Sequence, residues 1–124
     1  MIVRLNHLGF RVDDLDKAIE IYEKLGFSVQ TRFGKGDWAL AAMMRKGDDG
    51  IELFQFKNPD DELSQKISNH TAFTTDDIEA DVQLFLDNGY SLSIPISDGT
   101  VVKRYAYVAD KYGVQIEICE PLGS

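Results

Sequence analysis

The chain has 124 residues, a net charge of −8, 44% hydrophobic residues and 27% charged residues. That length fits one compact domain, and no apolar run approaches the length of a membrane span. The acidic excess argues against nucleic acid and anionic membranes as partners, because both attract clusters of Lys and Arg. The first residues carry no secretory signal, and the single Cys119 cannot form an internal disulfide. Both features are typical of a cytoplasmic protein.

The first half of the chain predicts a strand, a helix and then three strands. Asp13 and Asp14 supply an N-cap and favourable charge at the start of the helix, and Gly26 stands where a C-terminal glycine is expected. An apolar stripe on this helix is predicted, because apolar residues recur at helical spacing; they are Leu15, Ala18, Ile19, Tyr22 and Leu25. The four strands are expected at residues 2–12, 27–33, 38–45 and 50–57.

The second half repeats this order after a polar linker at residues 58–66. Its helix is expected at 78–88, and its strands at 67–75, 91–96, 101–109 and 114–120. The segment from Asn6 to Phe10 matches residues 69–73 at an offset of 63 residues, which places His7 over His70. With a small gap, Glu52 falls over Glu117. Such self-similarity indicates a duplicated unit.

We therefore predict an α+β fold of two tandem βαβββ modules, whose curled mixed sheets surround a concave metal cleft. The modules are residues 1–57 and 67–124 of a single domain that spans residues 1–124. One module of about 60 residues cannot bury both its helix and its sheet face alone.

Period-two alternation places both histidines and two glutamates on the sheet face away from the helices. The apolar neighbours are expected on the helix side; they are Leu8, Phe10, Val12, Ile51, Leu53, Val114, Ile116 and Ile118. A carboxylate among apolar strand residues is costly unless it is paired or binds a metal. The sequence therefore predicts a divalent-metal site with the ligands His7, Glu52, His70 and Glu117. This donor set suits Ni²⁺, Co²⁺, Zn²⁺, Mn²⁺ or Fe²⁺.

These residues give the chain a family resemblance. Residues 5–27, 50–53, 69–77 and 107–118 resemble the vicinal oxygen chelate superfamily of glyoxalases, bleomycin-resistance proteins and dioxygenases. In glyoxalase I the metal ligands follow the order His or Gln, Glu, His, Glu, and this chain fills all four places. The resemblance implies a Ni²⁺ or Co²⁺ preference. It also implies a homodimer in which His7 and Glu52 of one subunit meet His70 and Glu117 of the other.

The resemblance further implies a lactoylglutathione lyase type of reaction. A 2-oxoaldehyde–thiol hemithioacetal would be isomerised by proton transfer through a metal-stabilised enediolate, with glutathione or another thiol as co-substrate. Glu117 would be the catalytic base, and Glu52 would be either the second, exchangeable carboxylate or the base for the other face of the substrate. Arg11 matches the arginine that contacts the glutathione carboxylate. Further candidates for substrate contact, as well as for packing, are Phe54, Phe56, Tyr105 and Tyr107.

Three other functions remain open at this point. The first is a metal-free, drug-binding dimer of the bleomycin-resistance type, whose acidic charge suits a cationic drug. The second is a non-haem iron dioxygenase with His7, His70 and Glu117 as a facial triad. The third is an epimerase that acts beside a carbonyl with similar metal chemistry.

Overall fold

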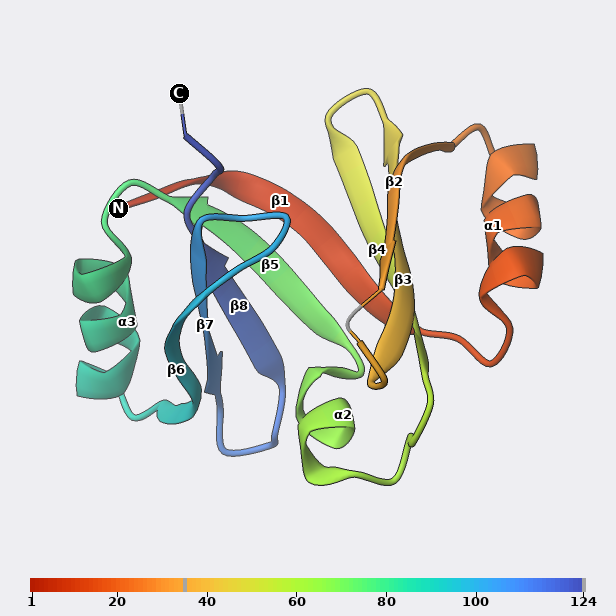
Figure 1. Cartoon of the computed structure of the whole chain (residues 1–124). Coiled ribbons are helices and arrows are strands. Elements are labelled where there is room, and N and C mark those ends of the chain that lie inside the picture. The colour runs from red at the N-terminus through yellow and green to blue at the C-terminus, as the bar shows by residue number, and fades with distance from the viewer. Residues whose placement is uncertain (35, 124) are drawn as a thin grey trace. The chain divides into compact units, whose positions relative to one another are not determined.

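The computed structural model describes residues 1–34 and 36–123; Lys35 and Ser124 lie outside the described part. The helices are α1 (Leu15–Lys24), α2 (Glu62–Ile67) and α3 (Ile78–Asp87). The strands are β1 (Ile2–Arg11), β2 (Ser28–Gly34), β3 (Ala39–Lys46), β4 (Asp49–Phe56), β5 (His70–Thr75), β6 (Ser91–Asp98), β7 (Arg104–Ala109) and β8 (Gln115–Cys119). This order confirms the predicted α+β fold of two βαβββ modules (Figure 1). Among the described residues, no helix is long and apolar enough to cross a membrane.

The contacts divide the chain into two compact units. Residues 7–69 form one unit, and residues 1–6 together with the chain from His70 onward form the other. Within the first unit the strand order is β2-β3-β4-β1, and β1 runs parallel to β4 while the other pairs are antiparallel. Within the second unit the order is β5-β8-β7-β6, with β5 parallel to β8. Each unit therefore carries the predicted mixed strand pairing.

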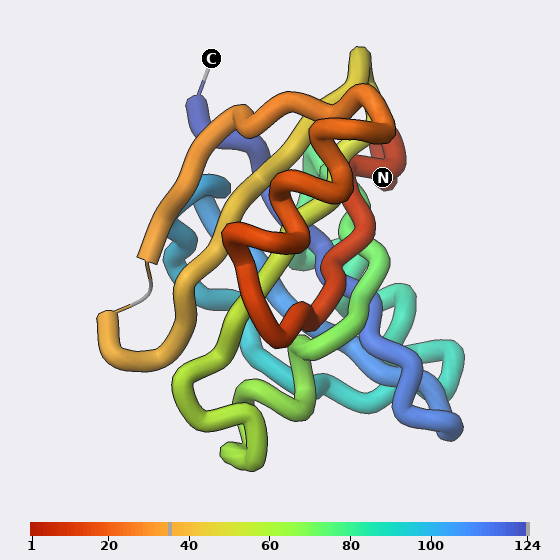
Figure 2. Tube along the Cα trace, turned by 90° about the vertical axis from the view of Figure 1, so that its right-hand side faces the viewer, coloured from red at the N-terminus to blue at the C-terminus, as the bar shows by residue number. Residues whose placement is uncertain are grey.

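Helix α1 packs against β2, β3 and β4 of its own unit, as the side view of Figure 2 also shows. The buried core between them consists of Leu15, Ala18, Ile19, Ala42, Met44, Ile51 and Leu53. The predicted placement of Leu25 in this stripe is wrong: the helix ends at Lys24, and Leu25 is 60% exposed. Gly26, at φ +100°, then turns the chain away in a conformation that suits glycine. Leu8 is exposed as well. From this part of the chain, Phe10 and Val12 pack against the core.

Asp14 caps α1 as predicted, since its side chain accepts a hydrogen bond from the Lys17 backbone N–H at 3.1 Å. We expect Asp14→Ala to lower the free energy of unfolding by about 1 kcal/mol, because one N–H of the first turn loses its acceptor. Urea unfolding followed by circular dichroism measures the change. Asp13→Ala is the matched control, and an equal loss in both variants would contradict a specific capping role.

In the second unit, α3 packs against β6, β7 and β8. Its core is formed by Ile78, Val82, Ala106, Val108 and Ile118, with Ile116 packed beside them. The expected burial of Val114 is wrong, because β8 begins only at Gln115 and Val114 is 56% exposed in the preceding turn. Strand β6 stands at the end of the strand order, contains Pro95 and is paired with β7 through two register shifts.

Arg104 joins α3 to the last strands of this unit. Its guanidinium donates to Glu79 at 2.8 Å and through Nη2 to Glu120 at 3.0 Å. Hydrogen bonds from Arg104 are the main cause that lowers the pKa of both glutamates below the ordinary value of 4.5.

We expect Arg104→Met to be less stable than the parent protein at neutral pH, and the difference to vanish in acid. Because both carboxyl pKa values are lowered by folding, their contribution is present above pH 4.5 and is lost as the pH falls through the folded values. Thermal unfolding between about pH 7 and about pH 3 tests this. Lys111→Met, at an exposed cation, is the control. A pH-independent difference would contradict the electrostatic explanation.

Candidate metal-binding half-sites

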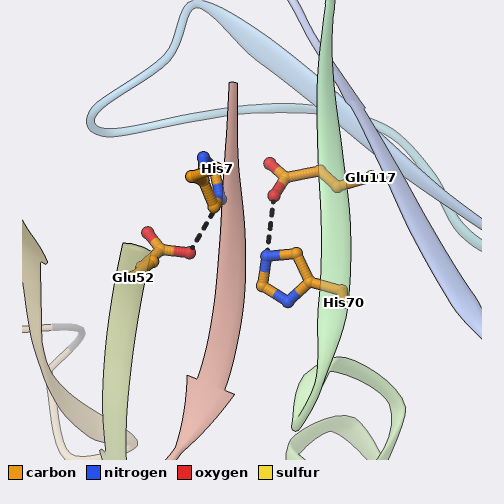
Figure 3. Close-up of side chains that lie close together, drawn as sticks. All are labelled: His7, Glu52, His70 and Glu117. Atoms are coloured by element: carbon orange, nitrogen blue, oxygen red, sulfur yellow. Dashed lines mark ion pairs between the residues drawn. The ribbon is translucent and has the colours of Figure 1, made fainter. Parts of the chain in front are cut away.

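The first unit holds His7 and Glu52 as a buried pair. His7 lies on β1, and Glu52 lies on the parallel strand β4. The Cα of Glu52 is paired with that of Gly9 on β1. His7 Nε2 is 3.3 Å from Glu52 Oε1 (Figure 3), and the two residues are 3% and 4% exposed. Ile51 and Leu53, on either side of Glu52, point into the core below α1. Strand alternation therefore turns Glu52 to the face away from that helix, as predicted.

The second unit builds an equivalent pair from His70 and Glu117. His70 lies on β5 and Glu117 on the parallel strand β8, paired with Ala72. His70 Nε2 is 3.2 Å from Glu117 Oε1, and both residues are buried (Figure 3). In both units the glutamate is in register with the residue two positions after the histidine. The sequence repeat thus corresponds to a repeated local geometry, which we call the two half-sites.

The donors in each half-site are of the kind that can hold a metal ion. Two ligand atoms about 2.1 Å from one ion lie about 3.0 Å apart at a right angle and about 3.4 Å apart in a tetrahedron. The N–O distances of 3.3 Å and 3.2 Å fall in this range. They are longer than the roughly 2.7–2.9 Å of a strong charge-assisted hydrogen bond. The chemistry and spacing of both pairs therefore fit coordination of a divalent cation.

Tyr107 is part of the second half-site. It lies opposite Glu117 across the β7–β8 pair and is buried. Its hydroxyl donates to Glu117 Oε1 at 3.2 Å and lies 3.4 Å from His70 Nε2. Tyr105 stands next on the same face, 6.0 Å from the Tyr107 ring. The pKa of the Tyr105 phenol is raised mainly by burial, and the nearby charge of Glu117 raises it further.

Phe54 and Phe56 follow Glu52 on the same face of β4. Their rings stack with centroids 5.6 Å apart, and the ring of Trp38 packs against that of Phe56 with centroids 5.3 Å apart. Both phenylalanines are buried. They therefore form an apolar wall beside Glu52, and their contact with a substrate stays a prediction.

Arg11 is separate from the His7–Glu52 pair within its unit. It is exposed and lines an open depression at the start of α1, together with Asp13, Asp14 and Lys17. Neither His7 nor Glu52 lines that depression. Contact between Arg11 and a substrate carboxylate stays a prediction.

Gln115 is not among the site residues predicted from the sequence. Its Oε1 atom is buried and has no hydrogen-bond partner within the described residues. The Cα of Gln115 is paired with that of His70, and Gln115 precedes Glu117 by two positions on the same strand. Strand alternation from Glu117 could have identified it, because both side chains leave the same face.

Comparison with known proteins agrees with this architecture. Residues 4–118 match the family model described as the Glyoxalase/Bleomycin resistance protein/Dioxygenase superfamily. The chain therefore belongs to this superfamily, as the sequence motifs predicted. A sequence comparison with curated proteins gives no significant match.

Several solved structures share the fold. Methylmalonyl-CoA epimerase from Mycobacterium tuberculosis is 23% identical with a TM-score of 0.81, over 98% of this chain and 90% of that chain. A variant of the Streptomyces coelicolor methylmalonyl-CoA epimerase, in complex with 2-nitronate-propionyl-CoA, is 22% identical with a TM-score of 0.80, over 99% and 100%. A mutant of 4-hydroxymandelate synthase from Streptomyces coelicolor is 14% identical with a TM-score of 0.79, over 98% and 39%. At these identities the similarity shows the fold alone.

Proposed function

We propose that the protein is a divalent-metal-dependent enzyme that moves a proton at the carbon beside a carbonyl group. The specific proposal is a glyoxalase I type of lyase, which acts on the hemithioacetal of a 2-oxoaldehyde and a thiol. The observation that carries it is the presence in each unit of a buried imidazole within 3.3 Å of a buried carboxylate. Membership of a superfamily that includes glyoxalases supports it.

The proposed ligands are His7 and Glu52 from one half-site and His70 and Glu117 from the other. Nickel, cobalt or zinc is the proposed ion. When bound, it supplies Lewis-acid charge that stabilises the negative oxygen formed as the carbon–hydrogen bond breaks. Buried carboxylates need such a counter-charge, because burial of an anion without one is costly. The two imidazoles make half of the donors nitrogen, which disfavours cations such as Ca²⁺ that prefer oxygen ligands.

Glu117 is the proposed base. Its carboxylate takes the proton from C1 of the hemithioacetal, and the electron pair of the broken C–H bond moves into the enediolate. The same carboxylate, which exchanges its proton with solvent, then protonates C2, and the hydroxyl proton passes from the C1 oxygen to the C2 oxygen, so that the product is an isomer of the substrate and no oxidant or reductant is consumed. Glu52 remains a ligand during this cycle. Phe54 and Phe56 are the proposed apolar wall for the substrate, and Arg11 the proposed partner of a thiol carboxylate.

Metal analysis combined with substrate assays tests the proposal. Protein purified without chelator should contain metal, lose activity when the metal is removed, and regain activity with Ni²⁺, Co²⁺ or Zn²⁺. Methylglyoxal with glutathione, and then with other thiols, is the first substrate series. Oxygen consumption that requires Fe²⁺ would indicate a dioxygenase instead. Racemisation of a 2-methyl thioester would indicate an epimerase, and ligand binding without metal would indicate a drug-binding protein.

We also propose a homodimer, located in a reducing cytoplasm. A mixing experiment tests how its metal centres are assembled. One variant carries His7→Ala and Glu52→Ala, and the other carries His70→Ala and Glu117→Ala. Co-refolded chains regain activity if each centre takes one half-site from each subunit, as the glyoxalase resemblance implies. Without rescue, each centre is built by one chain.

A further inference from the structure

The two half-sites differ at the position directly across the strand pair from each glutamate. The residue directly across from Glu117 in the antiparallel pair is Tyr107, whereas the residue directly across from Glu52 is Met43. Directly opposed residues share a face of the sheet, so each neighbour lies beside its carboxylate. A phenol offers an O–H donor, but a thioether carries no proton to donate. The two glutamates therefore have different immediate surroundings in an otherwise repeated arrangement.

Tyr107 is well placed to act on Glu117. Its hydroxyl donates to Glu117 Oε1 at 3.2 Å, and its ring is held edge-to-face against His70 at a centroid distance of 5.2 Å. Only about 4% of Tyr107 is exposed. A buried side chain packed in this way keeps its hydroxyl in one place, so the hydrogen bond is directed at a fixed point beside His70.

A glutamate that serves both as a metal ligand and as a base accepts a proton more readily after it leaves the metal, because the charge of the cation favours the ionised carboxylate. A buried carboxylate that leaves a cation loses its counter-charge, and an alternative hydrogen-bond donor reduces that cost. We propose that Tyr107 is a positioning residue that receives Glu117 when it detaches from the metal and holds it where it takes the substrate proton. This inference rests on the proposed metal-dependent proton transfer.

The matched position in the other half-site is occupied differently. Met43, opposite Glu52, offers no hydroxyl, whereas Tyr107 offers one to Glu117. Tyr107 therefore favours the detachment of Glu117 specifically. The hydrogen bond engages one oxygen of Glu117, and a carboxylate has a second oxygen that can accept the substrate proton.

Tyr107→Phe tests the proposal by two separate measurements, one of turnover and one of metal binding. A hydrogen bond to a charged group contributes enough for its loss to lower kcat about 10- to 100-fold, with KM unchanged. The affinity for Ni²⁺, measured by calorimetry, should stay the same or rise, because the metal no longer competes with Tyr107 for Glu117. A residue that merely orients a ligand would give the reverse: weaker Ni²⁺ binding. Unchanged kcat or weakened Ni²⁺ binding overturns the inference.

Two further variants complete the experiment. Tyr90→Phe removes the phenol oxygen of a partly buried tyrosine that packs against the core of the same unit, and should leave kcat and Ni²⁺ affinity at the parent values. Tyr107→Met gives Glu117 the type of neighbour that Glu52 has, and should lower kcat in the same way as Tyr107→Phe. If the parent protein binds no Ni²⁺, Co²⁺ or Zn²⁺, the proposed function itself fails. If the parent is active and Tyr107→Phe matches it, only the role of Tyr107 is refuted.

Discussion

Replacement of Glu117 by Gln is expected to abolish most proton transfer while part of the metal affinity remains. An amide oxygen can still coordinate a cation, but the amide cannot accept the C1 proton. Loss of a general base typically lowers the rate by roughly 10²–10⁴-fold. Transfer of solvent deuterium into the product, followed by NMR, measures the proton step directly, and calorimetry with Ni²⁺ measures binding in the same preparation.

Two variants control this result. Glu20→Gln changes an exposed glutamate on α1 and should exchange deuterium at the parent rate. Glu52→Gln tests the other half-site, where we expect a larger loss of Ni²⁺ affinity than in Glu117→Gln. Turnover by Glu117→Gln at the parent rate would refute the assignment of the base. A greater loss of deuterium exchange in Glu52→Gln would transfer the role to Glu52.

Removal of His7 is expected to lower the affinity for Ni²⁺ and Zn²⁺ by at least about 100-fold. Mutation of a group outside the ligand shell already costs roughly 10–100-fold, and a ligand contributes more. His7→Gln should keep a larger share of the affinity than His7→Ala, since Gln occupies this position in some members of the superfamily. His70→Ala should lose affinity to a similar extent as His7→Ala, because the two half-sites have matching geometry.

Circular dichroism establishes that each histidine variant is folded, so that lost affinity is not lost structure. Parent-like Ni²⁺ affinity in His7→Ala, beside a strong loss in His70→Ala, would contradict the four-ligand centre. It would place the ion at the second half-site alone.

Much of each unit follows from the sequence because the signal is local. The stripe of Leu15, Ala18 and Ile19 is a property of helical spacing, and the structure buries all three. Alternation on β4 likewise separates Ile51 and Leu53 from Glu52 without knowledge of any neighbour. The internal repeat then transfers the His–Glu pattern from one module to the other.

The remaining features depend on register or on short capping interactions. The face of Tyr107 follows from alternation, but its position opposite Glu117 depends on how β7 and β8 pair through the turn between them. Helix α2 has only six residues, too few for a periodic pattern. Its N-cap is Asp61, whose side chain accepts hydrogen bonds from the N–H groups of Leu63 and Ser64, within the segment predicted as a linker.

The irregular edge of the second unit bears on self-association. A proline has no N–H to offer a neighbouring strand, and the register shifts of β6 interrupt the even row of donors that an incoming strand would need. Continuous extension of the sheet by another molecule is therefore disfavoured along β6. Contacts that another copy makes along β6 should accordingly involve side chains rather than backbone pairing, which discourages open-ended fibrous growth from this edge.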